Sequence, residues 1–248
     1  GHSKWSTIKR KKGAIDAKRG KIFTKIIKEI SIAVKEGGSS DPESNPRLRL
    51  AISNAKGANM PKDNVERAIK KASDKDGAKY EHVTYEGYGP SGIAFFIEAS
   101  TDNINRTVSN VRAIFTKFNG SLGTNGSLEF MFDRKGVFTI PMENISMDNE
   151  EFEMELIDGG AEDVEKESDF IIVYTSFEDF GAMQKKLEEL GIEAESADLQ
   201  RIPKTTSTLD IHASKTIMNM VEKFEEDDDV NNVFHNLEMT DELLEQLD

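Results

Sequence analysis

Apolar residues recur at helical spacing through the first 80 residues of the chain. The segment from residue 17 to 35 gathers its apolar residues on one side of a helical wheel, because steps of three and four residues return to the same face. The opposite side of that wheel carries Lys18, Lys21, Lys25 and Lys28. Two further helices are predicted over residues 46–58 and 62–72, the first with Asn45 as its N-cap.

From residue 82 onward the hydrophobic period shortens toward two, which is typical of β-strands. Residues 136–202 alternate strands and helices in the order β-α-β-β-α-β, which is the ferredoxin-like arrangement. Further strands are predicted on either side, over residues 82–86, 92–99, 127–132, 205–210 and 230–236. Together with helices expected from residues 104 and 213 onward, these flanking strands are expected to complete a second ferredoxin-like unit.

The patterns therefore predict an α+β protein of three domains, one of them inserted in another. A basic three-helix domain is expected over residues 1–80. One α+β domain is expected to combine residues 81–133 with residues 204–248. An acidic ferredoxin-like α+β domain is expected over residues 134–203, inserted between those two segments.

Charge is divided unequally between the ends of the chain, which carries a net charge of −14. Residues 1–80 contain 20 Lys and Arg against 9 Asp and Glu, a net of +11. Residues 81–248 contain 12 against 37, a net of −25. Such a split indicates a basic domain that binds a polyanion and an acidic remainder that repels it.

The one-signed lysine face and the neighbouring run Lys9-Arg10-Lys11-Lys12 favour phosphate binding over an ordinary solvated helix face. Each neutralised phosphate releases condensed counterions, and lysine holds phosphate without reading a base. Trp5 either stacks on a nucleic-acid base or belongs to a disordered terminus, and the sequence favours neither interpretation. The candidate nucleic-acid-binding residues are Lys4, Trp5, Lys9, Arg10, Lys11, Lys12, Lys18, Arg19, Lys21, Lys25, Lys28, Arg49 and Lys56. A further candidate contact surface is Asn105 with Arg106, beside an N-cap at Asp102 or Asn103.

No catalytic, metal or cofactor site is predicted. The chain has no cysteine, and its four histidines are too scattered to form a local ligand motif. The pattern G-x-G-x-x-G at residues 87–92 lies between two strands and is assigned to a turn, not to a dinucleotide site. The acidic run at residues 225–229 is assigned to a solvated helix end. No secretory signal or membrane-spanning run is recognised, so a cytoplasmic location is expected.

Six motifs stand out: GHSKW at residues 1–5, DAKRGKIFTK at 16–25, NPRLR at 45–49, NMPKDN at 59–64, YEGYGP at 85–90 and TDNINRT at 101–107. They resemble segments of the YebC/PmpR family, with small departures at Ser91 and Asn119. The resemblance implies a three-domain cytoplasmic protein without known catalytic activity. Bacterial members are described as probable DNA-binding transcriptional regulators. A mitochondrial relative activates translation, and some bacterial members are linked to relief of ribosome stalling.

Three functions stay open at this point, and none of them is enzymatic. The first is a DNA-binding transcriptional regulator, and the second is a translation factor or translational activator that docks on ribosomal RNA. The third is a protein-binding scaffold with an incidental basic domain, which a large apolar patch on the acidic domains would favour. The absence of a helix-turn-helix signature inclines the interpretation toward RNA. The expected partners are DNA or ribosomal RNA, with the ribosome or other proteins meeting the acidic domains, and no membrane.

Overall fold

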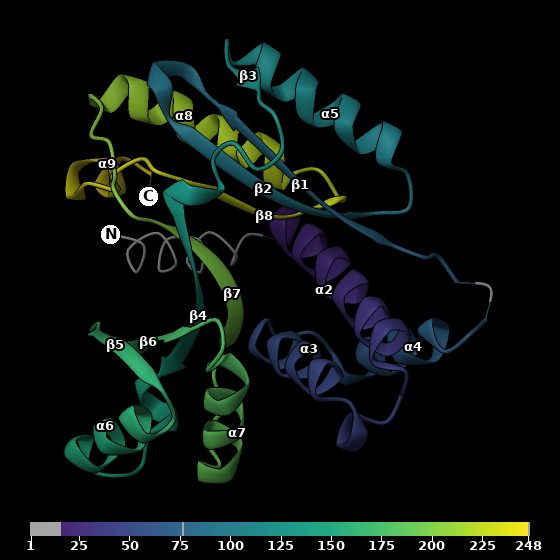
Figure 1. The fold of residues 1–248 in the computed structure, drawn as a ribbon. Coiled ribbons are helices and arrows are strands. Elements are labelled where there is room, and N and C mark those ends of the chain that lie inside the picture. Colours follow the sequence, from purple (N-terminus) through teal and green to yellow (C-terminus); the bar gives the residue numbers. More distant parts are fainter. Residues whose placement is uncertain (1–15, 76, 248) are drawn as a thin grey trace. The chain divides into compact units, whose positions relative to one another are not determined.

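The computed structural model describes residues 16–75 and 77–247 (Figure 1). The chain forms two compact units, which are described one at a time. Unit 1 contains the chain through Lys21, residues 78–133 and residues 201–248. Unit 2 contains residues 22–77 and 134–200. The mixed α+β class is confirmed, with a helical N-terminal region and two four-stranded antiparallel sheets. The division into three domains stays a prediction.

The sheet of unit 1 has the strand order β3-β1-β2-β8, so the β1–β2 hairpin lies in its centre. Helices α5 and α8 both contribute to one buried cluster and cover the same face of this sheet (Figure 1). The elements are β1 (Glu81–Tyr88), the 3-10 turn η2 (Pro90–Gly92), β2 (Ala94–Thr101), α5 (Ile104–Lys117), β3 (Ser121–Leu122), η3 (Glu129–Met131), α8 (Ile211–Glu225), β8 (Val230–His235) and α9 (Asp241–Gln246).

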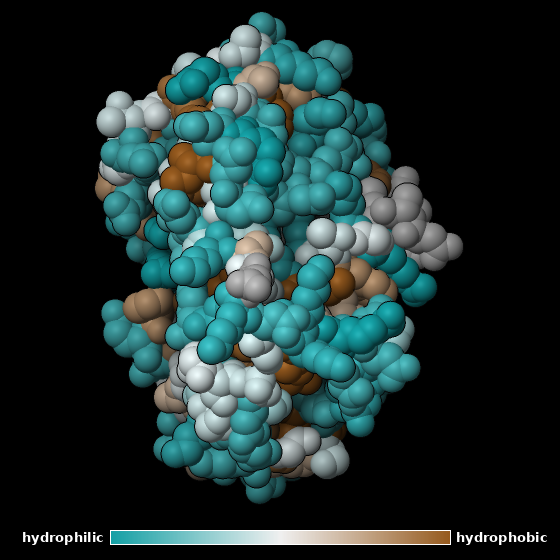
Figure 2. Space-filling view, turned by 90° about the vertical axis from the view of Figure 1, so that its right-hand side faces the viewer, coloured by the Kyte–Doolittle hydropathy of each residue, from teal (hydrophilic) through white to brown (hydrophobic). Residues whose placement is uncertain are grey.

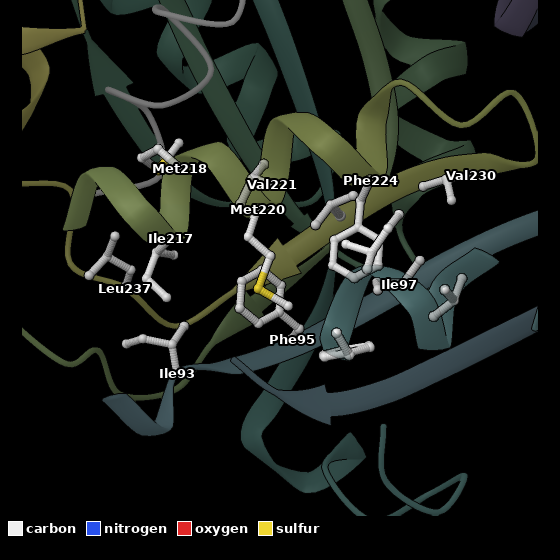
Figure 3. Close-up of a cluster of buried hydrophobic side chains, with 14 of the residues drawn as sticks. Ile93, Phe95, Ile97, Ile217, Met218, Met220, Val221, Phe224, Val230 and Leu237 are labelled. Carbon is white, nitrogen blue, oxygen red and sulfur yellow. The ribbon is translucent and has the colours of Figure 1, made fainter. Parts of the chain in front are cut away.

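Aromatic rings fill the core between this sheet and its helices. Phe95 of β2 meets Phe224 of α8 with ring centroids 6.0 Å apart, and Phe115 of α5 lies 5.2 Å from Phe224. Figure 3 shows Phe95 and Phe224 among the buried aliphatic residues of α8 and the sheet. The cluster joins chain segments about 130 residues apart, which belong to one compact unit.

Two strands predicted for unit 1 are wrong. Residues 127–131 are not a strand, because the buried carboxylate of Glu86 accepts a hydrogen bond from the Leu128 amide at 2.9 Å and residues 129–131 form the 3-10 turn η3. The Leu128 amide is then unavailable to a strand ladder, and the short β3 pairs with β1 instead. Residues 205–210 are not a strand either, since only Ser207 makes a β-bridge there and the following residues lead into α8.

The sheet of unit 2 has the strand order β5-β6-β4-β7, and β6 runs antiparallel to both β4 and β5. This order, with one helix after the first strand and one after the third, is the predicted ferredoxin-like arrangement. Helices α6 and α7 share one buried cluster with the sheet. The elements are β4 (Phe132–Pro141), the 3-10 turn η4 (Met142–Asn144), α6 (Asn149–Asp158), β5 (Ala161–Lys166), β6 (Phe170–Ser176), α7 (Phe180–Leu190) and β7 (Ser196–Pro203).

Unit 2 also contains α3, α4 and the part of α2 from Ile22 onward, and these predicted helices share a core of their own built from Ile30, Leu48, Ala55 and other apolar residues. The predicted N-cap is confirmed, because the Asn45 side chain accepts from the Leu48 amide at 3.1 Å. The elements are α2 (Asp16–Gly37), the 3-10 turn η1 (Pro42–Ser44), α3 (Pro46–Gly57) and α4 (Lys62–Ala72). Within the described residues, no helix is long and apolar enough to cross a bilayer.

Candidate nucleic-acid interface

The predicted basic arm lies outside the described residues. This applies to Lys4, Trp5, Lys9, Arg10, Lys11 and Lys12, and the side chain of Lys18 is not described either. Their role therefore stays a prediction from sequence. The described part of the predicted lysine face begins at Arg19, which is exposed at the start of α2.

Lys21 is exposed on α2 and forms an ion pair within unit 1. Its Nζ lies 2.9 Å from Oδ1 of Asp228, and both side chains are about half exposed. The hydrogen bond to Asp228 raises the pKa of Lys21, so the ammonium stays charged at neutral pH. An exposed pair of this kind contributes about 0–1 kcal/mol, which a phosphate can replace without a large loss.

Lys28 does not lie on an exposed face, contrary to the helical-wheel prediction. It is only 8% exposed, whereas Ile27, expected on the buried side, is 41% exposed. Ile30 and Ile32 are both buried although they lie on opposite sides of the helix. The second half of α2 is therefore covered on more than one side, which a wheel that assumes one buried face cannot represent. Lys25 is half-buried, so the face weakens toward the C-terminal end.

The two predicted contact residues of α3, Arg49 and Lys56, form ion pairs with carboxylates of unit 2. Arg49 Nε lies 3.3 Å from Glu188 Oε1, and its Nη1 donates to the Pro42 carbonyl at 3.0 Å. Lys56 Nζ lies 2.6 Å from Glu193 Oε1. Both acids belong to the acidic segment between residues 134 and 200. Any anion that approaches Arg49 or Lys56 therefore competes with carboxylates of their own unit.

Helix α3 contacts the edge strand β7 through two hydrogen bonds of the Asn54 side chain. Nδ2 of Asn54 donates to the Ala197 carbonyl at 3.0 Å, and Oδ1 of Asn54 accepts from the Ala197 backbone amide at 2.9 Å. At Gly57 the two segments meet so closely that a Cβ would lie 1.8 Å from the Glu195 carbonyl oxygen. The glycine at this position is therefore required by the docking of α3 on β7.

Gly57→Ala is expected to lower the free energy of unfolding of unit 2 by about 1–3 kcal/mol, because the added methyl overpacks a backbone contact that has no side chain to move aside. The measurement is urea denaturation followed by far-UV circular dichroism. Gly181→Ala in α7 is the matched control, since no atom lies within 4 Å of the added Cβ. Equal stability of the two variants would contradict this account of the α3–β7 contact.

Helix α4 presents a cationic face that the analysis of sequence did not select. Arg67, Lys70 and Lys71 are all exposed, and their spacing of three and four residues brings them to one side of the helix. The buried side holds Val65 and Ala68. The spacing rule that identified the α2 lysines also applies to this face. Two acids in α4, one of them Asp63, lower the net charge of the helix, so its cations did not stand out in the sequence.

Arg106 has a structural role in unit 1. Its guanidinium donates to both oxygens of Asp229, at 3.0 and 2.8 Å, and to Asp102 at 2.8 Å. These bonds raise the pKa of Arg106. Thr107 also donates to Asp229 at 2.8 Å, so the start of α5 is tied to the turn before β8. Of the two predicted N-caps of α5, Asn103 is the one observed, and the neighbouring Asn105 is exposed.

In the described ranges, no three His, Asp or Glu side chains converge in a way that could hold a metal ion. The surface in Figure 2 is mainly hydrophilic, and its apolar residues appear in small separate groups. Exposed cations are therefore available to an anionic partner on α2 and α4, whereas Arg106 is paired within unit 1.

Known proteins match this chain along nearly its whole length. A family model described as the TACO1/YebC protein N-terminal domain matches residues 3–75. A second, described as the TACO1/YebC second and third domain, matches residues 80–237. A "probable transcriptional regulatory protein" from Geotalea uraniireducens is 50% identical over 248 residues, which is 100% of this chain and 99% of the relative.

Another "probable transcriptional regulatory protein", from Treponema denticola, is 52% identical over 241 residues, or 96% of each chain. The crystal structure of a conserved hypothetical protein from Aquifex aeolicus has a TM-score of 0.80 and 42% identity, covering 92% of this chain and 94% of that one. Family models, full-length relatives and a solved fold agree, and the chain belongs to the TACO1/YebC family.

Proposed function

We propose that this protein is a non-enzymatic regulator of gene expression that binds nucleic acid through its basic helical domain. The observation that carries the proposal is the segregation of charge, +11 over residues 1–80 against −25 over the remainder. Relatives named as probable transcriptional regulatory proteins support the regulatory part. The cytoplasmic location expected from the sequence belongs to the same proposal.

The exposed face of α4 extends the predicted interface beyond α2. Arg67, Lys70 and Lys71 lie within one turn of each other, so a single phosphate backbone can meet all three. Lys70 and Lys71 also lie in the last turn, where the helix dipole favours cations. The exposed cations of α4 add to those of α2 and support binding by charge.

Replacing Arg67, Lys70 and Lys71 with glutamine is expected to weaken nucleic-acid binding and to flatten its salt dependence. If all three contact duplex phosphates, the slope of log K against log salt falls by about 2.7 units, or 0.9 for each phosphate. Fluorescence anisotropy with a labelled duplex over a range of salt concentrations measures this slope. Because all three side chains are exposed, the variant should unfold at the wild-type temperature.

The matched control replaces three exposed cations outside the helical domain, Arg112 and Lys117 of α5 and Lys185 of α7, with glutamine. It removes the same charge and is expected to leave the slope nearly unchanged, because contact with phosphate, and not net charge alone, releases counterions. A control slope that falls as far as that of the α4 variant would place binding outside the helical domain.

The family's usual description favours DNA, but the geometry supports a second candidate, a translation factor that docks on ribosomal RNA. Reading a DNA sequence requires side chains at base edges, and arginine is the commonest reader of guanine. Arg49, a predicted contact, is held by Glu188 and by backbone carbonyls. The exposed cations of α2 and α4 are mostly lysines, which supply affinity with little choice among sequences.

Competition between DNA and ribosomes is expected to separate the two candidates. Labelled DNA carrying a proposed promoter is bound to the full chain and titrated with scrambled DNA and with purified ribosomes at physiological salt. We expect weak discrimination among duplexes and effective competition by ribosomes. A preference for the promoter above about a hundredfold, equivalent to roughly 2.7 kcal/mol, without ribosome competition would overturn the translation candidate.

A further inference from the structure

The outward side of α6 carries two apolar side chains that its own fold does not use. Met154 is 72% exposed and Ile157 is 69% exposed, whereas Phe152 and Leu156 on the other side are buried in the core. Positions 154 and 157 are neighbours on one face of the helix, so the two side chains form one patch. Two large apolar residues this exposed and side by side are unlike the single apolar residues scattered over ordinary surfaces.

Carboxylates surround this patch. Helix α6 contains five Asp and Glu and no Lys or Arg, and residues 134–200 hold 19 acids against 5 bases, a net of −14. On the helix, Glu150 precedes Met154 by one turn and Ile157 by two, so the three form a stripe. Glu151 is also exposed beside the stripe. Among the residues that the structure describes, neither Glu150 nor Glu151 forms an ion pair.

The remaining acids of α6 are already neutralised by lysines of unit 2. Lys186 of α7 lies 3.0 Å from Glu155 and 2.8 Å from Asp158, and it lowers the pKa of Asp158. Lys166 of β5 pairs with Glu153. These ion pairs connect α6 to its neighbours α7 and β5. The carboxylates without such a partner are those beside the apolar stripe.

The negative charge beside the stripe decides which kind of molecule can bind there. Nucleic acid and anionic lipid are repelled by a face with this density of carboxylates. A second copy of this chain is disfavoured as well, because a two-fold contact would set the same acids against each other. A cationic protein segment is attracted, and its apolar residues gain by covering Met154 and Ile157. Methionine suits such a surface because its flexible side chain adapts to different partners.

We propose that the outward face of α6, made by Met154 and Ile157 with Glu150 and Glu151, is a docking surface for a cationic amphipathic helix of another protein. The convex surface of a helix accepts a second helix by ridge-into-groove packing. Apolar residues of the partner cover Met154 and Ile157, while Lys or Arg at its margins meet Glu150 and Glu151. This surface does not depend on the helical domain that is proposed to bind nucleic acid.

The test measures binding of the full-length chain to a fluorophore-labelled peptide of leucine, alanine and arginine, patterned as an amphipathic helix. Met154→Gln with Ile157→Gln is expected to lower the affinity by about tenfold or more, because the apolar contact is lost. Both residues are exposed, so the thermal stability of this variant should match that of the wild type. Wild-type chain that does not bind the peptide, or a variant that binds it equally well, would overturn the proposal.

General attraction between opposite charges is separated from docking by a charge-matched pair of variants. Glu150→Gln with Glu151→Gln is expected to weaken binding and reduce its salt dependence, whereas Glu178→Gln with Glu189→Gln, also exposed in residues 134–200, should change little. Equal losses in the two variants would overturn the proposal. A wild-type dimer that dissociates when Met154 and Ile157 are replaced would also overturn it, by assigning the face to a second copy.

Discussion

Replacing Lys18, Lys21 and Lys25 together with glutamine is expected to lower the affinity for duplex DNA by about a hundredfold at physiological salt. Three lost phosphate contacts reduce the slope of log K against log salt by about 2.7 units, and this slope converts to roughly two decades of affinity near 0.15 M salt. Lys21 must first leave Asp228, but that exposed pair is weak. Anisotropy titrations at several salt concentrations measure both quantities.

Lys28→Gln is the internal control for this experiment, because the helical wheel assigns Lys28 to the same face and the structure buries it. The single change should leave the salt slope unaltered, and its main effect should appear in the thermal unfolding temperature. An unchanged slope in the triple variant would move the binding site away from α2. A lower slope in Lys28→Gln would contradict the burial of that lysine.

Phe224→Ala is expected to lower the free energy of unfolding of unit 1 by about 3–5 kcal/mol, which is typical for removal of a fully buried phenylalanine. The Phe224 ring packs against Phe95 (Figure 3) and against Phe115, both more than 100 residues earlier in the chain. Its loss leaves a cavity between α8 and the sheet. Denaturation in urea followed by circular dichroism and calorimetry measures the change.

Two further phenylalanines control this measurement. Phe130→Ala removes a ring that is 69% exposed and should change stability by no more than about 0.5 kcal/mol. Phe138→Ala removes a buried ring from the sheet of unit 2 and should be about as costly as Phe224→Ala. If the two units unfold in separate transitions, each buried variant should shift only its own transition. A Phe224→Ala protein as stable as Phe130→Ala would contradict the described core.

Local signals in the sequence were sufficient for the helices and for the ferredoxin-like sheet. Asn45 was recognised as an N-cap, and the cap of α5 was narrowed to Asp102 or Asn103, because a side-chain oxygen at that position satisfies a free backbone amide. The order of strands and helices between residues 136 and 202 followed from hydrophobic periodicity alone. These features depend on residues close together in the chain, which is why the sequence alone could reveal them.

The errors occurred where distant residues decide the outcome. The strand predicted over residues 127–132 is wrong for residues 127–131, where Glu86, about 40 residues earlier, accepts a hydrogen bond from the Leu128 amide and residues 129–131 form a 3-10 turn. The candidate site changed for the same reason. Arg49 and Lys56 are paired with Glu188 and Glu193, about 140 residues further along the chain, and no periodicity links such partners.

The sequence by itself determined the α+β class, the helical start of the chain, the strong charge asymmetry and the membership of a family. Periodicity, capping and net charge are properties of local segments, so they can be read without coordinates. Only the tertiary structure decided which cations remain exposed, namely Lys21 and the α4 face but not Lys28. It alone also located the apolar stripe on α6. Burial and ion pairing depend on which segments meet in space, and those contacts join residues far apart in the chain.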